Sequence, residues 1–161
     1  MSILRGLISE NVDRHTRDIL TLTATASITS AAHAGRTLLM GEVGGNAAAT
    51  FTLPAATGTG SVFKFVVSVV NTSNYLIQVA DATDTIDGQI MITDADGTDA
   101  SSMVTAAASD TITLNGTTTG GGAIGDYVEL IDIASNQYAV SGMVTCAAGS
   151  NIATMFSATV S

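Results

Sequence analysis

Short apolar runs that alternate with polar residues, each closed by turn-forming residues, constrain the fold of this chain more than any other feature. Between residues 35 and 80, three apolar runs follow one another, separated by turns rich in glycine and asparagine. Pro54, the only proline, ends the run over 50–53 because it has no N–H to donate to a strand ladder. Alternation with a period of two is typical of half-buried β-strands. The stretch therefore predicts strand, turn, strand, turn, strand.

The same pattern continues to the end of the chain, with turn signals about every ten residues and no β-α-β units. It predicts an all-β domain of about ten short strands over residues 19–161. A compact β-sandwich, a jelly-roll-like fold and a barrel all fit this pattern. One helical turn is expected between Ser30, as its N-cap, and Gly35. The expected strands are 19–28, 36–40, 50–53, 62–70, 75–80, 86–92, 102–106, 111–114, 127–133, 137–146 and 152–160.

Residues 1–18 form a short N-terminal arm, whose residues 2–18 are the only stretch with helical spacing of apolar side chains. An isolated helix of this length is marginal in water. The arm is therefore either a frayed terminus, a helix packed on its own domain, or a segment that orders on a partner. The last alternative is favoured because the arm carries large aliphatic residues in a chain otherwise rich in alanine. Its expected anchors are Leu4, Leu7 and Ile8.

Charge separates the arm from the body. The chain has a net charge of −9, and residues 19–161 hold eleven of the 14 acidic residues but only Arg36 and Lys64 as cations. An acidic body repels a phosphate backbone, which argues against a nucleic-acid partner. Charged residues make up only 12% of the chain, so its surface suits packing against copies of itself or a protein partner. No apolar run approaches the roughly 20 residues that cross a membrane, and no secretion leader is expected.

The chain lacks the motifs of the common enzyme classes. It has no GxSxG, HExxH or CxxC, and the glycine-rich stretch 116–125 lacks the lysine of a phosphate-binding loop. His33 has no second ligand-type residue nearby, and Cys146, the single cysteine, is expected to be a buried, inert thiol. We therefore expect a protein that is not an enzyme and needs no cofactor.

One acidic loop, DADGTD at 94–99, is the best candidate for a metal site. Asp94, Asp96 and Asp99 offer the hard oxygen ligands that calcium prefers. The glycine stands at the wrong position for an EF-hand loop, and no glutamate follows at the twelfth position. A solvated acidic loop is the simpler interpretation, and calcium binding is the alternative.

A weak internal repeat relates residues 50–80 to residues 111–142. Each segment has an apolar residue, Thr-Leu, a Thr/Gly loop, a strand with a central aromatic residue, and then Ser-Asn before a tyrosine strand. Two copies of a three-strand unit would form two facing sheets, each covering the apolar face of the other. The alternative is coincidence in a sequence rich in threonine and glycine.

The order of several motifs resembles a known family. HAGRTLLM (33–40), TLPAATGTG followed by FKFV (52–66) and TITLNGTTTGG (111–121) appear in this order within residues 19–161. In this respect the chain is similar to the head decoration, or cement, proteins of tailed bacteriophages, especially marine ones. The first eighteen residues lie outside the resemblance.

The resemblance implies a structural virion protein that binds the outer surface of the phage capsid and stabilises it. The expected partners are the major capsid protein and further copies of the chain, with a homotrimer as the assembly. In that setting, the arm residues Leu4, Leu7 and Ile8 are expected to contact the capsid. A tail fibre, spike or other adhesive virion domain is the alternative, and a carbohydrate- or calcium-binding module is a third one.

Overall fold

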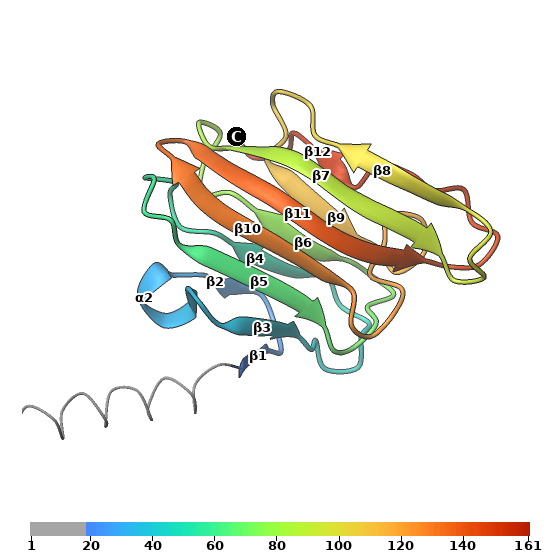
Figure 1. The fold of residues 1–161 in the computed structure, drawn as a ribbon. Coiled ribbons are helices and arrows are strands. Elements are labelled where there is room, and N and C mark those ends of the chain that lie inside the picture. The colour runs from blue at the N-terminus through green and yellow to red at the C-terminus, as the bar shows by residue number, and fades with distance from the viewer. Residues whose placement is uncertain (1–18) are drawn as a thin grey trace, which may run out of the picture.

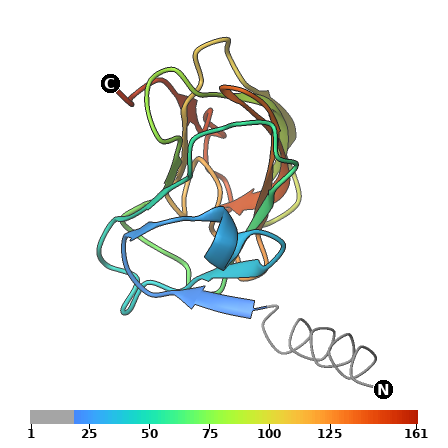
Figure 2. The same ribbon diagram turned by 90° about the vertical axis from the view of Figure 1, so that its left-hand side faces the viewer.

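The computed structural model describes residues 19–161, which form two β-sheets packed face to face as a sandwich (Figures 1 and 2). This confirms the predicted all-β class and selects the sandwich among the expected architectures. The elements are β1 (Ile19–Leu22), β2 (Ala26–Ser27), α2 (Ser30–His33), β3 (Thr37–Met40), β4 (Ala49–Thr52), β5 (Val62–Val67), β6 (Tyr75–Gln78), β7 (Thr85–Asp94), β8 (Ala100–Val104), β9 (Thr111–Leu114), β10 (Tyr127–Ala134), β11 (Gln137–Cys146) and β12 (Phe156–Ser157).

The two sheets are mixed, with parallel and antiparallel neighbours. The seven-stranded sheet has the order β1-β3-β5-β10-β11-β7-β8, and the five-stranded sheet has the order β12-β9-β6-β4-β2. In the larger sheet, β1, β3, β5, β11 and β7 run in one direction, whereas β10 and β8 run in the other. Figure 1 shows the arrows of β5, β11 and β7 pointing to the same end. We call the end where these strands begin the entry end and the end where they finish the exit end.

The core lies between the sheets because inward side chains alternate along each strand. In β5, Phe63, Phe65 and Val67 are buried, while the residues between them are partly exposed. Phe51 of the facing sheet stacks on Phe65 with 5.8 Å between ring centroids. Tyr138 is fully buried, and its hydroxyl donates a hydrogen bond to the Pro54 carbonyl at 2.7 Å, so no polar atom of this ring is left unpaired.

Most strands lie where the alternation predicts them, with differences at the two ends of the domain. The single strand expected over 19–28 is divided: β1 joins the larger sheet and β2 the smaller one, because residues 23–25 cross between them. The strand expected over 152–160 is reduced to β12. The predicted helical turn is present, but its N-cap is Thr29, whose hydroxyl accepts from the Ala32 N–H, and not Ser30.

The two segments of the proposed repeat do not each form one sheet, so that expectation is wrong. Their first strands, β4 and β9, flank β6 in the smaller sheet, and their second strands, β5 and β10, are neighbours in the larger one. Their third strands differ: β6 lies in the smaller sheet and β11 in the larger. Each segment therefore contributes strands to both sheets.

Buried carboxylates hold the connections between the sheets. Asp132, which is 3% exposed, accepts hydrogen bonds from the N–H groups of Thr57, Gly58 and Thr59 at 2.6–3.0 Å. The Thr59 hydroxyl adds a fourth at 2.7 Å. Burial alone would raise the pKa of Asp132, but these hydrogen bonds outweigh burial and hold its pKa below the ordinary value. Asp132 thus fastens the loop between β4 and β5.

Asp110 acts in the same way near the C-terminus. Its carboxylate accepts from the N–H groups of Thr159 and Val160 at 2.8 and 3.1 Å, and from the Thr111 hydroxyl at 2.8 Å. These contacts hold the last residues of the chain against β9. Backbone donors that no strand pairs are therefore satisfied by acidic side chains.

We expect Asp132→Asn to lower the free energy of unfolding by about 1–3 kcal/mol at pH 7, because an amide carries no charge and only one acceptor oxygen. A carboxyl group whose pKa is lower in the folded than in the unfolded protein stabilises the fold at pH values above its ordinary pKa of 3.8. This stabilisation is lost as the pH falls through the pKa of the folded state. The difference between wild type and variant should therefore shrink toward pH 2, measured by urea unfolding at both pH values.

Asp96→Asn is the matched control, since it removes the same charge from an exposed loop residue. Its cost should stay within about 0.5 kcal/mol. An equal cost of Asp132→Asn at both pH values would contradict the assignment of its effect to the ionised carboxylate.

Candidate interaction surface

A row of apolar side chains crosses the outer face of the seven-stranded sheet, which faces away from the core. The strand register places one residue from each of five adjacent strands side by side. Met143 is 57% exposed and Met91 43% exposed, and the other three are partly exposed. We call this set the apolar row; it consists of Leu39, Val66, Tyr127, Met143 and Met91.

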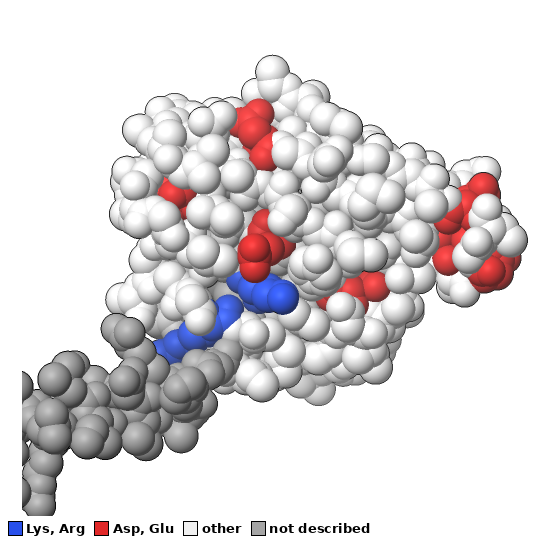
Figure 3. Space-filling view, viewed as in Figure 1, with Lys and Arg blue, Asp and Glu red and all other residues white. Residues whose placement is uncertain are grey.

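Uncharged atoms make up most of this face, and acidic groups stand at several separate places with fewer basic ones (Figure 3). In the next row of the sheet, Lys64 lies directly opposite Glu129 on the neighbouring strand, so the two charges offset each other. The Lys64 ammonium also lies 4.8 Å from the centroid of the Tyr127 ring, within cation–π range. At this position of the sheet the two opposite charges therefore offset each other.

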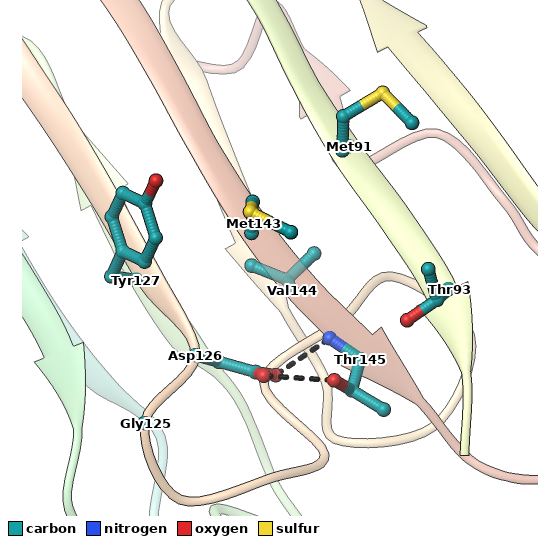
Figure 4. Close-up of a pocket in the computed structure, with 8 residues that line it drawn as sticks. All are labelled: Met91, Thr93, Gly125, Asp126, Tyr127, Met143, Val144 and Thr145. Carbon is teal, nitrogen blue, oxygen red and sulfur yellow. Dashed lines mark hydrogen bonds between the residues drawn. The ribbon is translucent and has the colours of Figure 1, made fainter. Parts of the chain in front are cut away.

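One part of the apolar row borders a hollow of about 290 Å³ near the exit end (Figure 4). Tyr127, Met143 and Met91 stand next to one another along one side of it, with Met143 in the middle, and Asp126, Thr145 and Thr93 lie nearer the end of the strands. Methionine is flexible and polarizable, so such a rim adapts its shape to a partner surface. The hollow is lined by Met91, Thr93, Gly125, Asp126, Tyr127, Met143, Val144 and Thr145.

The single carboxylate of the hollow is engaged in holding a loop. Asp126 accepts hydrogen bonds from the N–H of Thr145 at 2.7 Å and from its hydroxyl at 2.9 Å, as Figure 4 shows. Burial raises the pKa of Asp126 above its ordinary value, although these hydrogen bonds oppose the rise. Because both oxygens are used within the domain, this residue belongs to the structure of the hollow.

The acidic loop 94–99 directs two of its carboxylates, Asp94 and Asp96, to the hydroxyl of Thr98. Asp94 accepts from the Thr98 hydroxyl at 2.8 Å and from the Asp99 N–H at 3.1 Å. The hydrogen bond from Asp99, together with those from Thr98, holds the pKa of Asp94 at about 2. Asp96 also accepts from Thr98. Within residues 19–161, no group of three or more His, Cys, Asp or Glu could hold a metal ion together, so calcium binding by Asp94, Asp96 and Asp99 gains no support.

His33 and Cys146 lie at opposite ends of the sandwich. His33 ends α2 at the entry end, and its Nδ1 contacts Thr29 of the same turn. Cys146 ends β11 at the exit end and is fully buried, as expected, and burial raises the pKa of its thiol. A thiol in this state is a packing residue and a poor nucleophile.

The predicted arm anchors Leu4, Leu7 and Ile8 lie outside the described residues, so their contact with the capsid stays a prediction. The apolar row was not anticipated from the sequence. Its members come from strands between residues 39 and 143, and each is an ordinary outward position of its own strand. The sequence does contain a signal for this row. Met91, Tyr127 and Met143 are apolar residues at outward-facing positions of their strands, where the alternating pattern predicts polar residues.

Within residues 19–161, no helix has both the length and the apolar composition needed to cross a membrane. Comparison of the chain with protein-family models, with curated proteins and with solved structures finds no match.

Proposed function

We propose that this chain is a structural protein of a tailed-bacteriophage virion that binds the outer surface of the capsid and stabilises it. The observation that carries the proposal is the apolar row, a line of five side chains on the outer face of the larger sheet. Exposed apolar surface in this arrangement is typical of protein–protein contact sites. The family resemblance supplies the partner, the major capsid protein, and the location, the outside of the virion head.

The internal use of acidic groups supports a structural role without catalysis or a cofactor. The buried carboxylates Asp110, Asp126 and Asp132 accept hydrogen bonds from backbone N–H groups and hydroxyls of their own domain. Each therefore serves to order a loop. A decoration protein needs such rigidity, because many weak contacts add up to tight attachment only when their geometry is kept.

A homotrimer is the proposed assembly, following the same resemblance. In residues 19–161, the seven-stranded sheet ends at β1 on one side and at β8 on the other. Val104 on β8 is 66% exposed. Unpaired sheet edges favour association with other chains, and a defined oligomer would protect them.

We expect Met143→Glu to weaken binding of the purified protein to expanded, undecorated phage shells by at least about tenfold, because the contact would bury an unpaired charge. Thr50→Glu adds the same charge to the smaller sheet, where Thr50 is partly exposed, and should bind normally. Co-sedimentation with shells measures both. Normal binding of Met143→Glu would exclude the apolar row as the contact surface. Wild-type protein that does not bind shells would contradict the proposed function.

Deleting residues 1–18 should leave the β-domain folded, because residues 19–161 form a continuous buried core among themselves, and should lower its occupancy on shells, because the arm carries large apolar residues. Circular dichroism and thermal melting check the fold, and cryo-imaging of decorated shells measures occupancy. Unfolding of the truncated protein, or unchanged occupancy, would refute this prediction. Imaging also tests the alternative of an adhesive tail domain, since density for the chain would then lie on the tail.

A further inference from the structure

One edge of the seven-stranded sheet is open to pairing with a further strand. Among residues 19–161, β8 is the last strand on its side of the sheet and pairs with β7 alone (Figure 1). The edge strands of the smaller sheet, β12 and β2, have only two residues each, and such short edges resist pairing. β8 has five residues without a charge, a proline or a register shift against β7. It therefore lacks the features that protect a sheet edge from other chains.

Hydrogen bonds at the two ends of β8 show which of its backbone groups face outward. The Asp99 carbonyl accepts from the Asp94 N–H at 3.0 Å, and the Thr105 N–H donates to the Gly88 carbonyl at 3.1 Å. Successive residues of a strand direct their N–H and C=O groups to opposite sides, so the odd-numbered residues of β8 bond to β7. The even-numbered residues direct these groups away from β7, and all of them are exposed: Ala100, Ser102 and Val104.

The open edge continues the apolar row. Met91, the last member of the row, is paired with Ser102 of β8. Paired residues of neighbouring strands present their side chains on the same face, so Ser102 lies next to Met91 on the outer face. Its hydroxyl donates a hydrogen bond at 3.0 Å to Oε1 of Gln89, another outward residue of β7. A strand added beside β8 therefore brings a side chain to the end of the apolar row, and edge and row form one continuous surface.

An acidic loop lies at one end of this edge. Residues 94–99 join β7 to β8 at the exit end, and Asp96 and Asp99 are exposed there. The two cations of residues 19–161, Arg36 and Lys64, stand beside β3 and on β5, toward the opposite edge of the sheet. Pairing of β8 with β8 of a second copy would therefore bring no lysine or arginine of this body to the loop. A segment of another protein that carries such a cation complements the loop in charge.

We propose that β8 accepts an extended segment of the partner protein as an additional strand, with a lysine or arginine of that segment beside Asp96 and Asp99. Main-chain hydrogen bonds to Ser102 and Val104 hold the segment, and the apolar row packs against its outward side chains. This inference rests on the proposed function, which names the capsid protein as the partner. It adds which part of that partner is bound, namely an extended segment with a cation at the end that meets the acidic loop.

Ser102→Pro in the full-length protein tests the added strand. Proline is tolerated at an edge position whose N–H faces solvent, so the ladder with β7 should stay intact, as thermal melting checks. The variant lacks the N–H that an added strand needs, and we expect its binding to expanded, undecorated shells to weaken by about tenfold or more in co-sedimentation. Ser102→Ala is the matched control, because it keeps the N–H, and should bind as wild type does.

Asp99→Lys tests the cation of the bound segment in the same assay. We expect binding to weaken by about fivefold at low salt, and the loss to shrink at high salt, because exposed charges are screened. Asp81→Lys makes the same charge change on an exposed residue between β6 and β7 and should bind as wild type does. Normal binding of Asp99→Lys at low salt would overturn the assignment of a cation to the segment.

Hydrogen exchange of the wild-type protein keeps the test decisive even if Ser102→Pro does not fold. Exchange over residues 100–104 should slow when the protein binds shells. Unchanged exchange there, or normal binding of folded Ser102→Pro, would overturn the added strand while the proposed function stands. Wild-type protein that does not bind shells would contradict the proposed function and this inference with it. An oligomer in solution that Ser102→Pro dissociates, measured by sedimentation velocity, would assign β8 to a second copy and overturn the proposal.

Discussion

The sandwich depends on buried carboxylates that satisfy backbone donors where the chain passes between the sheets. Such connections leave N–H groups that no strand can pair, and an unpaired buried donor costs about 1–3 kcal/mol. Asp132 accepts from three successive N–H groups of the loop that leads from the smaller sheet to the larger one. Asp110 does the same for the C-terminal residues. The aspartates that make the chain acidic are thus partly structural, and their cost of burial is offset by several hydrogen bonds each.

This use of acidic residues also shapes the outer surface. The carboxylates of Asp126 and Asp132 are held by hydrogen bonds within the domain, and Lys64 faces Glu129 on the neighbouring strand of the larger sheet. The apolar row can then remain exposed next to hydroxyl-bearing and small residues without an electrostatic barrier to another protein. Glu42 is the exception among the buried acids, because its Oε2 has no hydrogen-bond partner among residues 19–161.

Much of the fold could be predicted from local sequence. Alternation and turn residues located most strands, because period-two burial is a property of each strand alone. The strand expected over 19–28 failed for an equally physical reason: residues 19–22 and 26–27 both alternate, and nothing local shows that the chain changes sheet between them. The two strands that carry a tyrosine after Ser-Asn, β6 and β11, have similar sequences but lie in different sheets. The partner of a strand depends on packing between segments that are distant in the sequence, which local patterns do not show.

The sequence by itself determined the class of the fold, the burial of Cys146, the acidic body and the distinct arm, because composition and periodicity are local properties. The tertiary structure decided the parallel neighbours in both sheets, and with them the surface that carries the functional proposal. The apolar row exists only because the register aligns Leu39, Val66, Tyr127, Met143 and Met91 across five strands. Likewise, the sequence places Glu42 in a turn and does not show that its carboxylate is buried. The tertiary structure buries this carboxylate and leaves its Oε2 without a hydrogen-bond donor among residues 19–161.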